Sequence, residues 1–194
     1  MTKTILWRRI DLPGHEVCTV GPYEDRWRLA GTAVIAYDGM PCELGYQVLC
    51  DPDWRTTSAR VVGRIGSREV RLELLADGAE RWQFNGAACP VVDGCIDLDF
   101  GFSPATNLLP IRRLSLGSGE SAEVVAAWLP FPSLSLEPLP QVYRRENEHT
   151  YRYESGDGTF VRTLEVDAFG FVTHYPGLWQ AEAATNVQGA HYDH

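Results

Sequence analysis

The chain has 194 residues, of which 44% are hydrophobic and 22% are charged, and its formal net charge is -9 at pH 7. This length is enough for one domain with a sizeable core, and the composition is ordinary for a globular protein. The acidic balance argues against nucleic acid and anionic membrane surfaces as partners, because both attract an excess of positive charge.

The first half of the chain predicts a series of β-strands separated by tight turns. Strand-like runs occupy residues 5–10, 15–20, 27–37, 41–50, 56–65, 69–75 and 81–85. Asp38-Gly39 and Asn85-Gly86 are typical of hairpin turns, and Gly21-Pro22 indicates a break. Gly31 lies inside a run and indicates a bulge or a close backbone approach. The even spacing favours an antiparallel sheet or barrel. The alternation of strands and helices that is typical of a parallel α/β fold does not occur in the sequence.

The second half continues the strand pattern. Residues 122–131 read as a helix by propensity or as a buried strand, and the Val-Val pair with the following prolines favours the strand. Residues 141–146 and 150–155 predict a hairpin that sets Val142 and Arg144 against Tyr151 and Tyr153. Strands are also expected at 159–166 and 171–175. We therefore expect a single β-rich domain over 1–180 and a loose tail over 181–194, where large apolar residues are few.

The stretch 95–116, CIDLDFGFSPATNLLPIRRLSL, carries the most informative pattern. Asp97 and Asp99 alternate with apolar residues, so on a strand their side chains point to one face, about 7 Å apart at their Cα atoms. Paired carboxylates can divide acid and base catalysis, as in a hydrolase, but they more often face solvent or pair with arginine. We expect Arg112 and Arg113, further along the stretch, to be the arginine partners.

A serine nucleophile is excluded in the same stretch. Residues 101–105 nearly match the G-x-S-x-G pattern of serine hydrolases, with Ala105 in place of the last glycine. The residue after Ser103 is Pro104, which has no N–H, although that position supplies an oxyanion-hole donor in those enzymes.

One short helix is predicted within residues 104–116. It begins either with Ser103 as N-cap and Pro104 in the first position, or with Asn107 as N-cap. Leu108, Ile111 and Leu114 would share a face, and Gly117 would end the helix.

The five cysteines form no C-x-x-C pair, and the histidines show no metal-ligand spacing within the folded region. The pattern fits reduced thiols in the cytoplasm rather than a disulfide framework or a zinc site. No apolar stretch is long enough for a secretion signal or a transmembrane helix. We expect no metal, no cofactor and no transmembrane segment.

Several blocks of the sequence resemble one known family. These blocks are Tyr46 and Trp54-Arg55, Asp97-Leu98-Asp99, Ser103-Pro104-x-Thr106-Asn107, 109–114 (LPIRRL), Ala127-Trp128 with Pro132, Gln141-Val142-Tyr143, Val166-Asp167 and 175–178 (YPGL). Together they resemble the family described as putative glycolipid-binding proteins, a bacterial family first defined as a domain of unknown function. The resemblance runs from about Trp7 to Trp179.

The resemblance implies a many-stranded, strongly curved antiparallel sheet, half-barrel-like, wrapped around a single helix, in a tight homodimer. It is similar in outline to lipoprotein carriers that hold acyl chains. The family provides no established catalytic or ligand residues, and its glycolipid role rests on the likeness of folds.

Three functions are compatible with these observations. In the favoured one, the protein binds a lipid or glycolipid and holds its apolar chain between the sheet and the helix. In the second, it is a structural or interaction dimer without a ligand, and in the third an enzyme that uses Asp97 and Asp99. We expect no catalytic residue, and the candidate ligand contacts are Trp54, Asp97, Asp99, Thr106, Asn107, Arg112, Arg113, Tyr143, Tyr151 and Tyr175.

Overall fold

Fifteen strands and one α-helix make up residues 2–187, the part of the chain that the computed structural model describes. The first eight strands are β1 (Thr2–Arg9), β2 (Gly14–Tyr23), β3 (Arg26–Tyr37), β4 (Met40–Cys50), β5 (Thr56–Ile65), β6 (Arg68–Ala76), β7 (Trp82–Phe84) and β8 (Ala87–Ala88). The others are β9 (Asp97–Phe100), β10 (Ser121–Leu129), β11 (Glu137–Asn147), β12 (Thr150–Ser155), β13 (Phe160–Val166), β14 (Val172–Tyr175) and β15 (Trp179–Val187). The helix α1 spans Leu108–Leu114.

All the strands belong to one sheet in the order β8-β7-β6-β5-β4-β3-β2-β1-β15-β14-β13-β12-β11-β10-β9. The sheet therefore consists of two meanders, β1–β8 and β9–β15, joined where β1 pairs with β15. This pairing corrects the tail expected over 181–194, because residues up to Val187 belong to β15. Residues 188–194, the rest of that expected tail, lie outside the described residues.

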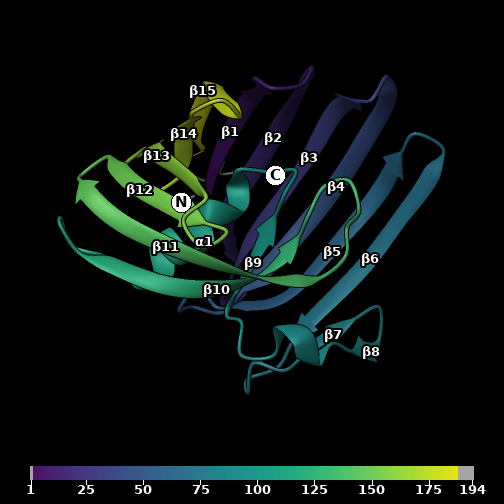
Figure 1. The fold of residues 1–194 in the computed structure, drawn as a ribbon, viewed down its shortest axis with the longest axis horizontal. Helices are drawn as coiled ribbons and strands as arrows, with labels where there is room; N and C mark the ends of the chain where they lie inside the picture. Colours follow the sequence, from purple (N-terminus) through teal and green to yellow (C-terminus); the bar gives the residue numbers. More distant parts are fainter. Residues whose placement is uncertain (1, 188–194) are drawn as a thin grey trace, which may run out of the picture.

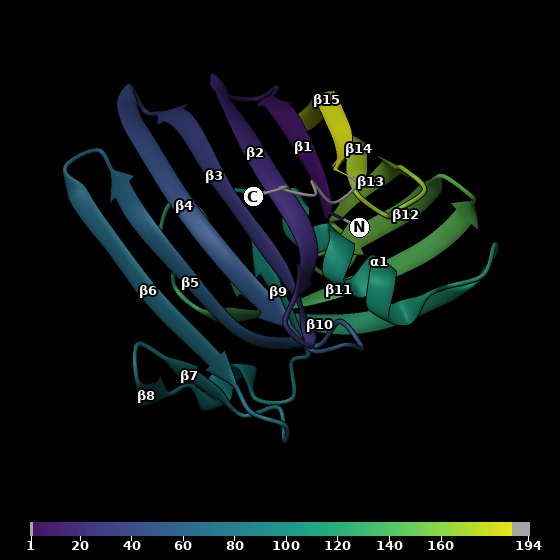
Figure 2. The same cartoon turned by 180° about the vertical axis from the view of Figure 1, so that it is seen from behind.

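The sheet curves so that its two meanders face each other across α1 (Figures 1 and 2). The predicted fold class is confirmed: a large, strongly curved, mainly antiparallel sheet surrounds one short helix and does not close into a barrel. The stretch expected at 122–131 is a strand, as the Val-Val pair indicated, although β10 spans Ser121–Leu129 and ends before Pro130.

The helix lies inside the sheet because it is part of the one parallel connection among the described strands. β9 and β10 run parallel, and parallel neighbours need a crossover rather than a hairpin. The chain leaves β9, makes a 3-10 turn at Ala105–Asn107 and continues as α1 before it reaches β10. The Ser103 Oγ accepts the N–H of Ala105 at 3.0 Å, so this hydroxyl supports the first turn. Ser115, in the left-handed conformation at φ 46°, ends the helix earlier than the expected Gly117.

Apolar side chains fill the space between the helix and the sheet. Leu108, Leu109 and Ile111 are buried in the same core as the inward residues of β1–β6. Gly31 on β3 lies opposite Tyr46 on β4, and a Cβ at Gly31 would lie 2.4 Å from the Tyr46 hydroxyl. The close approach expected at Gly31 is therefore present, and the Tyr46 side chain occupies the space that a Cβ at Gly31 would need.

Two local expectations were wrong. Gly21-Pro22 does not break the chain, since β2 continues to Tyr23. In the β11–β12 hairpin, Tyr143 and Arg145, rather than Val142 and Arg144, stand opposite Tyr153 and Tyr151. A one-residue change of register turns every side chain to the other face of the sheet. Arg145 therefore points toward α1 and Arg144 toward solvent.

Within residues 2–187, no helix has the length and apolar character that crossing a membrane requires.

Candidate functional site

Polar side chains gather on two sides of α1. On the side facing β9 and β11 they form a buried group that we call the anchor cluster, consisting of Asp97, Asp99, Thr106, Asn107, Arg113, Gln141 and Tyr143. At the other side, near the C-terminal end of α1, they line an open cavity that we call the rim pocket.

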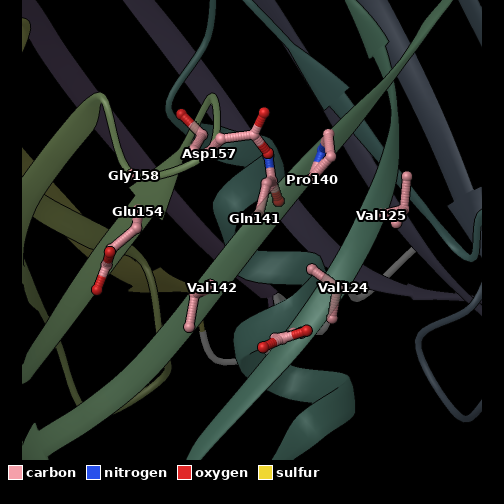
Figure 3. A pocket seen from close by; sticks show the side chains of 10 residues that line it. Val124, Val125, Pro140, Gln141, Val142, Glu154, Asp157 and Gly158 are labelled. Carbon is pink, nitrogen blue, oxygen red and sulfur yellow. The ribbon is translucent and has the colours of Figure 1, made fainter.

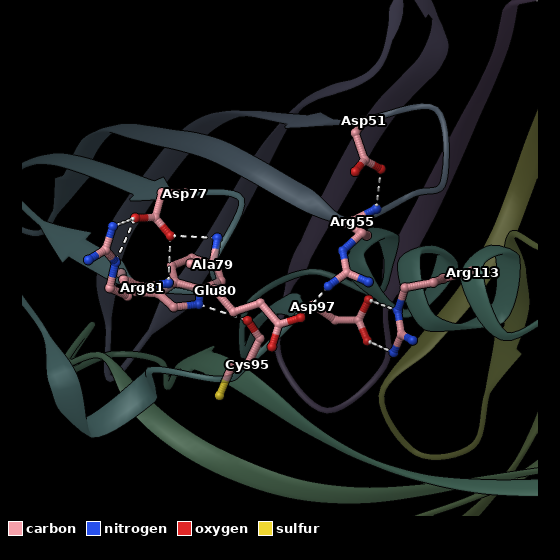
Figure 4. Close-up of polar contacts among 10 residues, drawn as sticks. Asp51, Arg55, Asp77, Ala79, Glu80, Arg81, Cys95, Asp97 and Arg113 are labelled. Carbon is pink, nitrogen blue, oxygen red and sulfur yellow. Dashed lines mark hydrogen bonds and ion pairs between the residues drawn. The ribbon is translucent and has the colours of Figure 1, made fainter.

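An ion pair between α1 and β9 forms the centre of the anchor cluster. Arg113 donates from Nε to Asp97 Oδ1 at 3.0 Å and from Nη2 to Oδ2 at 2.5 Å. The Asp97 side chain is 1% exposed and that of Arg113 15% exposed. Figure 4 shows these two parallel contacts beside the Arg55–Glu80 pair. Burial raises the pKa of Asp97, and the bonds and charge of Arg113 limit the rise. Of the two expected Arg–Asp bridges, this one is present.

Asp99 has neutral partners. It is half-buried, accepts the Thr106 hydroxyl at 3.1 Å and the Gln141 amide at 2.6 Å, and makes no ion pair with a described residue. Desolvation raises its pKa to about 6, although both hydrogen bonds oppose the rise. Asn107 donates to the Tyr143 hydroxyl at 2.9 Å, which ties the start of α1 to β11. The cluster thus engages both carboxylates with protein donors and fixes the position of a helix of seven residues.

Arg112, the neighbour of Arg113, packs against two aromatic rings instead. Its guanidinium carbon is 5.3 Å from the Trp54 ring centroid and 4.9 Å from that of Phe169. Trp54 itself stacks on Trp27 at 4.6 Å. Trp54 comes from the β4–β5 turn and Phe169 from the β13–β14 turn, so Arg112 bridges the two meanders at the open edge of the fold. Its Nη1 donates to the Phe169 carbonyl at 3.3 Å, while its Nε is buried without a hydrogen-bond partner among the described residues.

The rim pocket has a volume of about 210 Å³ and opens beside Arg112. It is lined by Ile111, Arg112, Ser115, Arg145, Glu148, Tyr151, Val166, Asp167, Ala168, Phe169 and Gly170. The lining residues come from α1, from the β11–β12 hairpin and from the β13–β14 turn. Of the residues predicted from the sequence, only Arg112 and Tyr151 line it, with Trp54 behind Arg112.

Among the lining residues that the sequence did not predict, Arg145 contributes the second guanidinium of the pocket. Its guanidinium is fixed by three backbone carbonyls: Leu116 at 2.8 Å, Asn147 at 3.1 Å and Glu148 at 3.2 Å. The correct hairpin register would have placed it inward, but the register shift between Arg145 and Asn147 hides that alternation in the sequence. For residues 167–170 the sequence predicted a turn but gave no indication that they line a pocket.

Neither arginine of the rim pocket forms an ion pair within residues 2–187. Asp167 pairs with Lys3, and its Oδ1 accepts the N–H groups of Phe169, Gly170 and Phe171. The Glu148 side chain is 80% exposed, so water screens its charge.

The balance of charge in the rim pocket is therefore positive. The partial negative charge at the C-terminal end of α1 opposes an anion by about 0.3–1 kcal/mol. Hydrogen bonds from charged groups contribute about 1.5–3 kcal/mol each, so the N–H donors that Arg112 and Arg145 retain outweigh the helix end.

The remaining predicted residues lie in the core or the anchor cluster rather than at the rim. Tyr175 packs edge-on against Tyr153 and beside Phe160 in an aromatic group. Tyr143, in the anchor cluster, is tilted against the same Tyr153 ring at 5.1 Å. These tyrosines stabilise the C-terminal meander and do not reach the rim pocket.

A third buried polar group stands apart from α1. Glu16 on β2 accepts the hydroxyls of Tyr46 at 2.5 Å and Ser103 at 2.6 Å through Oε1, while its Oε2 is buried without a partner among the described residues. Desolvation raises the pKa of Glu16 to about 8. This carboxyl therefore holds its proton near neutral pH.

The larger hollows lie on the outer face of the sheet. One groove, of about 460 Å³, runs over β10–β12 and is lined by Glu123, Glu154 and Asp157 among others, of which Figure 3 labels Glu154 and Asp157. Another, of about 580 Å³, lies over β2–β5. The first is acidic and the second offers mostly small side chains. Among residues 2–187, no group of three or more His, Cys, Asp or Glu side chains is arranged to hold a metal ion.

Comparisons with known proteins agree with this architecture. A family model described as "Putative glycolipid-binding" matches residues 4–181. A crystal structure of a DUF1089 family protein from Pseudomonas aeruginosa is 36% identical, with a TM-score of 0.74 over 85% of this chain and 91% of that chain. A β-barrel-like DUF1849 protein from Brucella abortus is 8% identical, with a TM-score of 0.55 over 94% of this chain and 96% of that chain, which is a likeness of fold alone. No curated protein matches the chain.

Proposed function

The chain belongs to the family described as "Putative glycolipid-binding", and from this premise we propose that it binds a lipid or glycolipid whose apolar chain lies between α1 and the curved sheet. The single observation that carries the proposal is the placement of α1. A short helix with an apolar face occupies the concave side of a large apolar sheet, and its C-terminal end borders an open pocket.

The core between α1 and the sheet is filled by the helix's own side chains, so an apolar chain enters by displacing them. The helix has seven residues, and helices of this length are unstable in isolation. Its position depends on the anchor cluster and on packing of Leu108, Leu109 and Ile111. The apolar area that an acyl chain buries offsets the apolar area that the displaced side chains expose. The net free-energy cost of the exchange is therefore low.

Lipid content is the direct test. Protein purified without detergent is extracted and analysed by mass spectrometry, and the delipidated protein is titrated with a fluorescent long-chain fatty acyl probe. We expect a co-purifying lipid and saturable probe binding near one per chain, with a matched short-chain probe binding at least tenfold more weakly. Absence of both signals would overturn the proposal and favour the alternative of a structural dimer without a ligand. The filled space between α1 and the sheet supports that alternative.

We also propose that the protein is a homodimer. The resemblance to the family implies a dimer, and the outer face of β2, β3 and β5 exposes Val17, Val34 and Val62, with Val34 56% exposed. Exposed apolar patches on strands are typical of interaction surfaces. Light scattering at micromolar concentration should give twice the chain mass. Val34→Glu should shift it to the monomer value, while Val125→Glu, on the outer face of β10, should not.

We place the protein in a bacterial cytoplasm. All five cysteines are free, and four of them are buried. Unpaired thiols are typical of reducing compartments. Fractionation of cells that produce a tagged chain tests the location, and recovery mainly outside the cytoplasm would overturn it.

A further inference from the structure

We propose that the rim pocket binds the anionic oxygen-bearing group of an acidic lipid, a phosphate or carboxylate, through Arg112 and Arg145. The inference rests on the proposed function, since it assigns the polar end of the same ligand. It adds a charge class and two binding residues.

Both guanidinium groups are held in place while they still have free donors. Arg112 packs against both the Trp54 and the Phe169 ring, which limits the movement of its guanidinium. Arg145 is braced from behind by the carbonyls of Leu116, Asn147 and Glu148. An arginine has five N–H donors in a planar fork, so each side chain retains donors beyond the protein bonds described. Groups that are fixed before binding lose little conformational entropy when a ligand arrives.

Arg112 has hydrogen-bond donors that the protein does not satisfy. Buried donors are nearly always satisfied by protein, water or ligand. Arg112 contributes its Nη1 to the Phe169 carbonyl, but its Nε has no partner within residues 2–187. The Nη2 of Arg112 also makes no hydrogen bond within residues 2–187, and it is not fully buried, so it is the donor that an anion in the rim pocket can reach. Planar guanidinium groups bind carboxylates and phosphates through two parallel hydrogen bonds, so an anion bound at Nη2 can bring Nε into contact by a small shift of the side chain.

The pocket's position fits a headgroup rather than an acyl chain. Ile111, on the apolar face of α1, forms part of its wall and also belongs to the core. A ligand that places its charged group beside Arg112 therefore has its attached chain directed toward the space that α1 fills. The acidic groove over β10–β12 would repel the same group.

The experiment compares three probes by calorimetric titration of the delipidated protein: short-chain phosphatidic acid, the diacylglycerol with the same chains, and glycerol phosphate. We expect phosphatidic acid to bind at least tenfold more tightly than either of the others. Arg112→Gln and Arg145→Gln should each remove that advantage while diacylglycerol binding changes less than twofold. Arg112→Lys should restore part of it, because it keeps the charge but loses the planar fork.

Arg71→Gln is the matched control, because Arg71 is exposed on β6 and carries the same charge. Thermal melting of each variant separates loss of binding from loss of folding. Equal affinity for phosphatidic acid and diacylglycerol would overturn the anion site and leave the proposed function standing. If glycerol phosphate were the only probe that bound tightly, the pocket would be a site for a free anion. The proposal that the anionic group belongs to a lipid would then be overturned. Failure of all three probes to bind would overturn the proposed function together with this inference.

Discussion

Arg112 and Arg113 are neighbours on α1, yet the two sides of the helix use the same side chain in opposite ways. Arg113 faces β9 and pairs with the buried carboxylate of Asp97. Arg112 faces the open edge, packs against aromatic rings and keeps an N–H donor without a partner among the described residues. The difference shows how a helix too short to be stable alone can be fixed on one side and remain available on the other.

The largest expected effect comes from breaking the buried pair. Asp97→Asn leaves the Arg113 guanidinium without its counter-charge, and loss of one partner of a buried pair costs about 3–5 kcal/mol. We expect the free energy of unfolding, measured by urea denaturation, to fall by that amount. Asp53→Asn, at an exposed turn position, should change it by less than about 0.5 kcal/mol.

The double variant Asp97→Leu/Arg113→Met sharpens the interpretation. Replacement of both charges by apolar groups of similar volume is often neutral, so the double variant should recover most of the loss. A double variant as unstable as Asp97→Asn would show that the pair contributes by its packing rather than by its charges.

Glu16 provides the next largest effect, since it is as buried as Asp97 but has no guanidinium in contact. Its pKa is about 8 in the folded chain against 4.5 unfolded, so between these values the folded state holds a proton that the unfolded state has lost. Stability therefore falls as pH rises through this window, by about 1.4 kcal/mol per pH unit at most.

Glu16→Gln should flatten this dependence. Urea midpoints at pH 5, 7 and 9 should decrease steadily for the original chain, and the variant should be more stable than it at pH 9. Identical pH profiles for the two proteins would contradict the assignment of the raised pKa to Glu16.

A smaller effect is expected at the start of the helix. Tyr143→Phe removes the hydroxyl that accepts from Asn107 and leaves a buried amide N–H without its partner. Such a loss costs about 1–3 kcal/mol. Hydrogen exchange of the α1 amides should quicken more than that of β3, because the damage lies between α1 and β11. Equal acceleration in both elements would mean that the bond does not hold the helix locally.

The smallest effect is predicted for Arg112, and it completes the comparison. A cation–aromatic contact contributes about 0.5–1 kcal/mol at an exposed site and about 2 kcal/mol when it is desolvated, so Arg112→Gln at this half-buried site should reduce the free energy of unfolding by no more than about 2 kcal/mol. A loss comparable to that of Asp97→Asn would show that Arg112 is structural, and the two sides of the helix would no longer differ.

Local signals in the sequence were sufficient for most of the fold. Asp38-Gly39 and Asn85-Gly86 form turns with positive φ at both residues, as those dipeptides predict. Residues 181–187 were predicted as part of a loose tail because their small side chains carry no strand pattern. They form part of β15 because they pair with the edge of β1. That pairing is a tertiary effect that no local window contains.

The candidate site was less predictable, and the two sides of α1 explain why. The anchor cluster lies largely within one stretch, so Asp97, Thr106, Asn107 and Arg113 were found from the sequence. The rim pocket needs Arg112, Arg145 and the 167–170 turn, which only the curvature of the sheet brings together. The bulge near Arg145 also inverted the predicted facing of β11.

The pairing of β1 with β15 sets the order in which the protein is completed. Apart from the parallel β9–β10 crossover, each half of the sheet pairs strands that are consecutive in the chain and can assemble from local hairpins, but Thr2 meets Val187 across nearly the whole chain. Contacts so distant in sequence form slowly, so the seam closes after both meanders exist. During synthesis on a ribosome, one edge of β1 remains unpaired until residues 179–187 emerge. In this interval the nascent chain is most prone to pair with other chains and aggregate.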